Sequence, residues 1–416
     1  MANRSRVEAV VSLFVTVHPH ELPSLLHAFT CFFFLLSAYF VILPLRDEGA
    51  ISLGLGKLPG LFMASLALTF IAAPASTYIF SLSHLSKGKV ALLNLVSISA
   101  TWARVIDSMN SESGSRLIGF VGAGATLGQL CGSLLAVAMA QLGPYLLLFA
   151  ALLMELAARS SIGIGQDETH EPQELSSTSE SVSQSVEHNF EPVNRLTASS
   201  MKHKFSAMLD GLQLILASTY LLHVCCFMWL TAVVSSFFYF QKAAVVAEAV
   251  ANALDRRRMF AQVNSFTAVF ILIGQLTLTG QILTSAGVTA AICAAPVISF
   301  ANMTTIAIWP TWIMVAISET LRKVLNYVLT RPGREVLFTV VTRDEKYKAK
   351  VCMDVLVQRL GDAAAAGIYK ILQGSLNKGP SAIALCALPV CFAWIITAFS
   401  LGRRQAHLAK SQALDQ

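Results

Sequence analysis

Hydrophobic positions along this chain gather into long runs, which short polar or basic segments separate. Most runs approach the ~20 residues that an α-helix needs to cross the hydrocarbon core of a bilayer. Only helices and closed barrels satisfy every backbone polar group in lipid, so the runs predict transmembrane helices. We predict about eleven spans. They cover residues 25–45, 60–82, 90–106, 117–140, 145–158, 219–240, 262–283, 288–309, 311–329, 363–376 and 383–401.

Composition agrees with this pattern. Of the 416 residues, 55% are hydrophobic and 13% are charged, whereas a soluble domain carries about 25% charged residues. The formal net charge is +6, but the basic residues lie in loops and at span ends, as the positive-inside rule requires. We therefore expect lipid, and not nucleic acid, as the partner of this chain. The eight cysteines are scattered and show no metal-ligand spacing, so no metal or other cofactor is expected.

A polar segment divides the chain into two apolar parts. Residues 166–192 are rich in serine and acidic residues without a helical or strand period, which is typical of disorder. We predict an N-terminal helical bundle over residues 1–163, a disordered cytoplasmic loop over 164–206 and a C-terminal bundle over 207–416. Carriers built from two helical halves have this organisation.

The distribution of basic loops tests the predicted topology. The C-terminal tail, with Arg403 and Arg404, and the basic segment 331–359 should both be cytoplasmic. Counting spans backwards puts the central loop on the same side. Five spans then separate that loop from the basic N-terminus, where an even number is needed. Either the N-terminus faces the other side, or one span is missing near the basic junction at residues 87–89.

Ionisable residues near or inside the spans are candidates for function, because a charge in a membrane usually pairs or faces water. The cluster Arg46-Asp47-Glu48 ends the first span; it is either an interfacial ion cluster or a group facing an aqueous cavity. Glu319 and Lys323 are four residues apart and could simply pair on one helix face. Lys370 lies among small and polar residues, as in the wall of a cavity.

A glycine-rich segment, residues 119–132, superficially resembles a phosphate-binding loop. It lacks the Lys-Ser/Thr pair that follows the glycines in a Walker motif. Gly124, Gly128 and Gly132 recur every fourth residue on one helix face, and small residues at this spacing allow two helices to approach closely. We therefore predict a packing role for this segment. With no nucleotide loop, catalytic dyad or metal site, the chain is not expected to be an enzyme.

One charged region contains a distinctive series of motifs. They are Lys323-Val-Leu-Asn-Tyr327, Arg331-Pro-Gly-Arg334-Glu335, Arg343-Asp-Glu345-Lys346-Tyr-Lys348-Ala-Lys350, Asp354-Val and Arg359-Leu-Gly361. Through these motifs the segment from Glu319 to Gln373 resembles the ATP/ADP antiporters of plastids and obligate intracellular bacteria, and Tyr39 to Asp47 resembles the end of that family's first span. The family is related to the major facilitator fold, with twelve spans in two six-helix halves.

The resemblance implies an all-α, major-facilitator-like transporter that moves a nucleotide such as ATP or ADP, or a similar anion, by alternating access. One departure concerns specificity: where the nucleotide carriers have Gly-Lys-Ser-Gly-Gly, this chain has an aspartate at Asp362. The residues expected to bind substrate are Arg46, Lys323, Arg331, Arg334 and Lys370. The residues expected to form a cytoplasmic gate of ion pairs are Arg343, Glu345, Lys346, Lys348, Lys350, Asp354, Arg359 and Asp362.

Two other functions remain open. The chain could be a proton-coupled carrier of a different organic solute, with Asp362 or Glu319 as the proton site. It could also be a non-transporting scaffold or a truncated membrane protein. The plastid envelope and other cellular membranes are equally compatible with the sequence.

Overall fold

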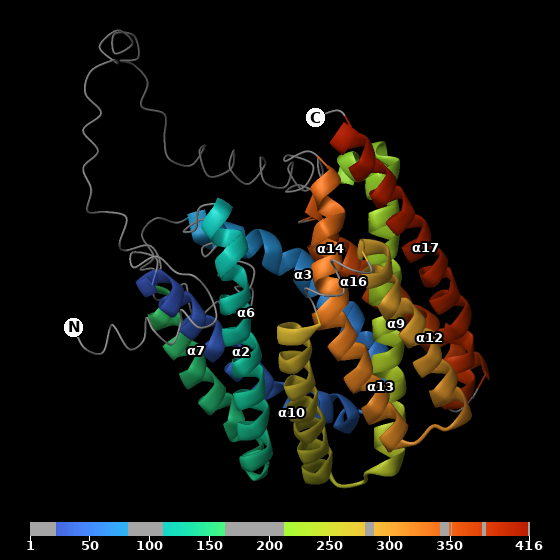
Figure 1. Cartoon of the computed structure of the whole chain (residues 1–416). Helices are drawn as coiled ribbons and strands as arrows, with labels where there is room; N and C mark the ends of the chain where they lie inside the picture. Colours follow the sequence, from blue (N-terminus) through green and yellow to red (C-terminus); the bar gives the residue numbers. More distant parts are fainter. Residues whose placement is uncertain are drawn as a thin grey trace, which may run out of the picture. The chain divides into compact units, whose positions relative to one another are not determined.

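The computed structural model describes residues 22–81, 111–162, 212–278, 287–341, 349–350, 352–376 and 380–414. These residues form helices joined by short turns, without a strand (Figure 1). Helices lie over every predicted span except residues 90–106, which fall outside the described residues together with residues 87–89 and the predicted loop 164–206. The predicted all-helical class is therefore confirmed.

The first part of the chain supplies four long helices. They are α2 (Leu22–Ser52), α3 (Leu58–Ser81), α6 (Ser111–Ala138) and α7 (Leu146–Ile162), with the short helices η1 (Leu55–Lys57) and η3 (Ala140–Tyr145) between them.

The second part begins with α9 (Thr219–Ala249), α10 (Ala253–Thr277) and α12 (Gly287–Ile308). Next, α13 (Trp312–Leu325) continues through the π-helix η5 (Asn326–Thr330) into α14 (Arg331–Leu337) and η6 (Phe338–Val340). A second π-helix, η7 (Met353–Val357), leads into α16 (Gln358–Leu376), and α17 (Pro380–Leu414) ends the chain.

Side chains in the connecting turns cap several of these helices. Ser218, Asn252 and Thr311 precede α9, α10 and α13, and each side-chain oxygen accepts a hydrogen bond from a backbone N–H of the first turn. The first N–H groups of a helix have no partner within it, so each cap satisfies a donor where the chain turns.

The chain forms two compact units. One contains residues 1–35, 74–125 and 152–205, and the other contains 36–73, 126–151 and 206–416. The helices α2, α3, α6 and α7 each contribute residues to both units. The division into bundles at residues 163 and 207 stays a prediction.

The second unit has an aromatic core between its helices. Here α9 packs against α16 and α17, and α12 packs along α17 (Figure 1). Phe240 of α9 stacks against Tyr369 of α16 with ring centroids 4.6 Å apart, and Phe227 of α9 faces Trp394 of α17. This core packs around one side of α9, and polar residues of α9 contact α2 and α13.

Small residues permit close helix contacts, as predicted for the glycine-rich segment. A Cβ atom added at Gly132 would overlap the backbone of Ser37 in α2, whose hydroxyl donates a 3.1 Å hydrogen bond to the carbonyl of Gly128. In the first unit, a Cβ atom at Gly124 would lie 2.8 Å from the ring of Phe29. The segment is helical and packs against α2, which agrees with a packing role.

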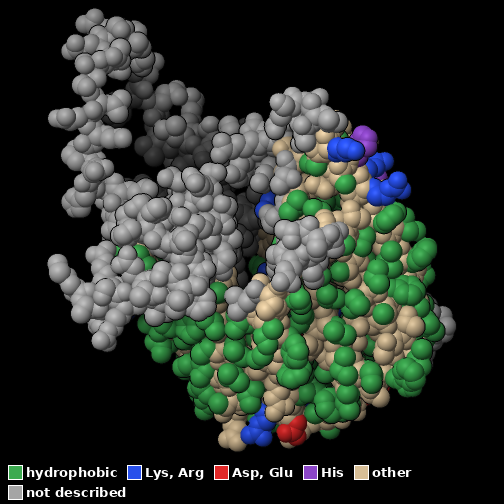
Figure 2. Space-filling model, viewed as in Figure 1, with side chains coloured by type: hydrophobic (Ala, Val, Ile, Leu, Met, Phe, Trp, Pro, Cys, Tyr) green, Lys and Arg blue, Asp and Glu red, His purple; other side chains and the backbone are tan. Residues whose placement is uncertain are grey.

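The outer surface is strongly apolar. Large side chains such as Leu148 and Ile371 are mostly exposed, and a soluble monomer does not expose apolar surface on this scale. Figure 2 shows hydrophobic side chains covering most of the described surface in view, with Lys and Arg near the C-terminal end of α17. Among the described residues, five helices are long and apolar enough to cross a membrane. The chain is thus a multi-pass membrane protein.

Candidate functional site

The candidate site begins at the C-terminal end of α2, where two neighbouring charges face different directions. The Asp47 side chain is 5% exposed, whereas that of Arg46 is 54% exposed. Successive residues of a helix point about 100° apart, so Asp47 turns inward while Arg46 remains at the surface. The Arg46 guanidinium still reaches the Asp47 carboxylate at 2.9 Å, and the Tyr239 hydroxyl donates to the same oxygen at 3.4 Å.

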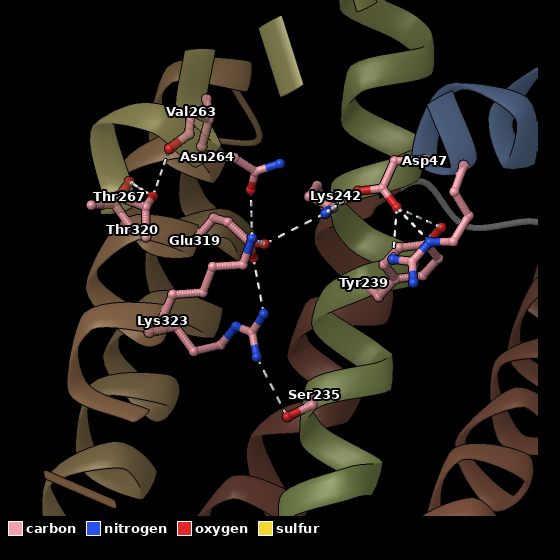
Figure 3. A network of polar contacts seen from close by, with 12 residues as sticks. Asp47, Ser235, Tyr239, Lys242, Val263, Asn264, Thr267, Glu319, Thr320 and Lys323 are labelled. Atoms are coloured by element: carbon pink, nitrogen blue, oxygen red, sulfur yellow. Dashed lines mark hydrogen bonds and ion pairs between the residues drawn. The ribbon is translucent and has the colours of Figure 1, made fainter. Parts of the chain in front are cut away.

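Lys242 of α9 is the centre of the site (Figure 3). Its Nζ atom lies 3.1 Å from Asp47 Oδ2 and 3.5 Å from Glu319 Oε1, so one buried ammonium connects α2, α9 and α13. The rings of Tyr239 and Phe260 also lie within cation–π distance of this nitrogen. A buried charge needs such partners, because its desolvation would otherwise cost several kcal/mol.

Glu319 of α13 contacts two cationic side chains besides Lys242. Its carboxylate accepts from Arg322 Nη2 at 3.0 Å and pairs with Lys323 Nζ at 2.8 Å. Lys323 also donates to Asn264 Oδ1 of α10 at 2.8 Å. The predicted pairing of Glu319 with Lys323 is therefore present, as part of a larger network. Four cationic side chains and two carboxylates form this network, so it carries a surplus of positive charge.

A small cavity of about 330 Å³ borders the network. Asp47, Lys242, Glu319 and Asn264 supply its polar lining, and residues of α9, α10 and α13 supply apolar walls. Ligand pockets combine apolar walls with a few placed polar groups in this way. Such a cavity could receive an anionic group beside Lys242, where hydrogen bonds to charged donors are strongest.

Glu48, the next residue of α2, forms a separate ion cluster. Its carboxylate lies 3.3 Å from Arg257 Nε and 3.6 Å from Arg256 Nη2, and it accepts a hydrogen bond from Ser52. Arg256 also donates to the carbonyls of Val250 and Ala251, in the turn before α10. Arg257 donates to the carbonyl of Ala140 in η3. The cluster thus joins the end of α2 to η3 and to the turn between α9 and α10.

The residues predicted to bind substrate fall in different places. Arg46 and Lys323 belong to the Lys242 network. Arg331 and Arg334 line a second cavity, and Lys370 is exposed on α16 and lines neither cavity.

The residues predicted to form a gate are only partly described. Arg343, Glu345, Lys346 and Lys348 lie outside the described residues. The remaining members pair locally: Arg334 with Asp354 at 3.5 Å, Arg359 with Asp362 at 3.2 Å, and the Lys350 ammonium with the Phe338 ring at 5.9 Å. Asp362 also accepts a 2.6 Å hydrogen bond from Ser236 of α9.

Sequence reasoning missed Lys242, Asn264 and Arg322. The predicted sixth span ended at Phe240, so Lys242 counted as a residue outside the membrane, but α9 continues to Ala249. Arg322 lies one turn after Glu319 and could have been found by the same spacing rule that selected Lys323. Nothing in the local sequence distinguishes Asn264 from an ordinary polar residue of a span.

Residues 299–405 match the family model described as TLC ATP/ADP transporter. No match was found among curated proteins.

Among solved structures, the chain is similar to the human organic anion transporter MFSD10 (TETRAN), at 15% identity and a TM-score of 0.48, covering 91% of this chain and 99% of that one. It is also similar to a bacterial homologue of the human lysosomal transporter Spinster in an inward-facing, unoccupied conformation, at 13% identity and a TM-score of 0.42, covering 95% of each chain.

The family match confirms the predicted resemblance to ATP/ADP antiporters. The matched segment contains Glu319, Arg322 and Lys323 of the candidate site, the two arginines of the second cavity and all of the predicted gate residues. Together with the apolar helices, the match identifies a membrane transporter that resembles ATP/ADP antiporters.

Proposed function

We propose that this chain carries an anionic solute of the nucleotide class across its membrane by alternating access, and that the network around Lys242 binds it. The observation that carries this proposal is the surplus of cations over carboxylates in the network around the buried Lys242, beside a cavity. In the absence of substrate, Asp47 and Glu319 form ion pairs with the ammonium groups of Lys242 and Lys323. An anionic group entering the cavity competes with these carboxylates for Lys242 and Lys323.

Competition of this kind explains why a binding site for anions contains carboxylates. Lys242 alone would be costly to bury, so the empty carrier needs a counter-charge. A substrate oxyanion supplies the same charge and replaces Asp47, which releases the end of α2 from α9. Arg46 is mostly exposed and is positioned to meet the solute before it reaches Lys242.

Specificity for ATP and ADP is the finer part of the proposal. The antiporter resemblance favours adenine nucleotides, but Asp362 stands where that family has lysine. Its carboxylate accepts a hydrogen bond from Ser236 and pairs with Arg359, so this position supplies no positive charge for a phosphate. We therefore expect weaker selection for highly charged nucleotides, with ADP accepted at least as well as ATP.

Counterflow in proteoliposomes tests the proposal. Vesicles containing the full chain are loaded with ADP or ATP, and the entry of each labelled nucleotide is measured. The binding variant is the double substitution Lys242→Met with Asp47→Leu, which removes both charges together and so leaves no unpaired buried partner. The control is Arg404→Gln, which removes one exposed charge from α17, away from the network. We expect exchange in the wild type and the control and its loss in the double variant.

Two results would contradict the proposal. Exchange that is unchanged in the double variant would exclude the Lys242 network as the binding site. Reconstituted wild-type protein that exchanges no nucleotide would exclude the nucleotide class. Uptake driven by a pH gradient in the same vesicles, without a counter-substrate, would favour the proton-coupled alternative, and inactivity under all conditions would favour a non-transporting protein.

A further inference from the structure

We infer that the second cavity is a separate binding site for a phosphate group. It measures about 280 Å³ and is lined by Arg331, Arg334, Asn326, Thr330 and Gln358, together with Phe227, Met228 and Thr231 of α9. Arginine is the side chain best suited to phosphate, because its planar donors match two oxygens at once. The amide and hydroxyl groups beside the two arginines can supply further hydrogen bonds.

This cavity is distinct from the one beside Lys242, although α9 and the continuous α13–η5 helix line both. Thr231 of the second cavity and Lys242 of the first are eleven residues apart on α9, or about 16 Å along the helix axis.

A buried hydroxyl in this cavity lacks a partner. Thr330 is 3% exposed, and its Oγ1 atom makes no hydrogen bond with any described residue. Most buried polar side chains are satisfied, so an unsatisfied group that lines a cavity indicates a missing ligand or water. Arg334, which lines the same cavity, pairs with Asp354 at 3.5 Å.

The backbone around this cavity is unusual as well. Asn326 and Thr330 are the first and last residues of the π-helix η5, and Gln358 directly follows the second π-helix, η7. Well under 1% of residues in proteins are in π-helices, and these segments occur frequently at functional sites. The π-helix η5 supplies two lining residues, and a third lining residue directly follows η7, which supports a binding role over a simple packing defect.

A phosphate group could come from a soluble anion or from a lipid headgroup, since basic pockets between spans bind both. The test uses the full chain in nanodiscs of phosphatidylcholine, titrated with inorganic phosphate and followed by calorimetry. It is made on the Lys242→Met, Asp47→Leu background, so that the first cavity does not contribute. A parallel series contains phosphatidic acid in the nanodiscs and no free phosphate, and is followed by native mass spectrometry of the bound lipid.

Two substitutions are added to this background. Arg331→Gln removes an exposed cation of the cavity that forms a cation–π contact with Tyr327, and it should weaken phosphate binding at least tenfold. Thr330→Val keeps the side-chain volume and removes the unpartnered hydroxyl, so it should weaken binding severalfold without lowering the unfolding temperature. Arg404→Gln serves as the control and should leave binding unchanged.

The two series separate the sources of the phosphate. Saturable binding of inorganic phosphate that Arg331→Gln weakens supports a soluble ligand, and retention of phosphatidic acid that Arg331→Gln abolishes supports a lipid. Equal binding in Arg331→Gln, Thr330→Val and their background, or no binding in either series, would overturn the inference. These measurements need no transport, so their outcome is independent of the nucleotide exchange proposed above.

Discussion

At the scale of single residues, the buried ammonium of Lys242 determines the behaviour of the site. Its two carboxylate partners come from α2 and α13, and all three side chains are less than 10% exposed. At a buried site of low dielectric constant, the free energy of a charge depends mainly on its nearest counter-charges. Removing one member of a buried ion pair should therefore lower the free energy of unfolding more than removing both members together.

The first prediction follows from this asymmetry. Lys242→Met leaves Asp47 with Arg46 and the Tyr239 hydroxyl and should lower the free energy of unfolding by about 3–5 kcal/mol, the usual cost of breaking a buried ion pair. The added substitution Asp47→Leu should recover most of that loss, because two apolar side chains then replace the pair. Chemical unfolding of the purified protein in detergent measures both. A double variant as unstable as the single one would contradict this account.

Sequence reasoning reached part of this site. It selected Arg46, Glu319 and Lys323 because charges at helix ends and inside spans are exceptional in a membrane. It could not show that Asp47 and Lys242, 195 residues apart, would meet, because that contact depends on how whole helices pack. Lys370 was selected for the same reason as Lys323, because it is a charge inside a predicted span, but its side chain is exposed on α16.

At the scale of elements, glycine sets how closely α16 approaches α9. A Cβ atom at Gly361 would lie 2.7 Å from the Cβ of Ala232 and 2.8 Å from the carbonyl oxygen of Trp229. Gly367 lies on the same helix, and a Cβ atom there would meet nothing within 4 Å. The two glycines therefore form a matched pair, one in a tight contact and one in open space.

The second prediction compares these positions. Gly361→Leu should lower the unfolding temperature strongly, since overpacking typically costs about 1–3 kcal/mol and here would push against backbone. Gly367→Leu should be neutral or stabilising, because leucine favours a helix over glycine by up to about 1 kcal/mol. Thermal unfolding of both variants under identical detergent conditions provides the measurement. Similar shifts at the two positions would show that the α9–α16 contact is not tight.

The pattern of hydrophobic residues predicted the helices well and their exact ends less well. Lipid demands helical backbone wherever the chain is apolar, so the existence of the spans follows from composition. The extension of α9 past Lys242 does not follow from composition, because a helix can continue beyond its apolar run where charged side chains are paired. The π-helices η5 and η7 were not foreseen either, since they have no periodicity of their own in the sequence.

At the scale of the whole molecule, a few polar contacts connect segments that are distant in the chain. The Glu48 cluster brings together the end of α2, the turn in η3 and the start of α10. The family match to residues 299–405 includes none of these segments. The match therefore gives no information about this junction.

The third prediction tests the junction by exchanging charges. Glu48→Arg places a third cation beside Arg256 and Arg257 and should lower stability by several kcal/mol, because buried like charges repel. Arg257→Glu should also destabilise, since it sets two carboxylates side by side. The combination of both should recover a measurable part of the loss, as a double-mutant cycle of unfolding free energies would show. Strictly additive losses would mean that the two side chains do not interact.

The contact between Asp47 and Lys242 also has a consequence for biosynthesis. The 195 residues between them take about 10–40 seconds to synthesise at 5–20 residues per second. Throughout that time the end of α2 has been made, yet the lysine that neutralises Asp47 and the arginines that neutralise Glu48 do not exist. Arg46 can already pair with Asp47 in the nascent protein, but the Glu48 carboxylate must stay hydrated, or shielded by the insertion machinery, until α10 emerges. A ribosome that stalls before residue 242 should thus release a fragment that quality control recognises by its unpaired Glu48 carboxylate.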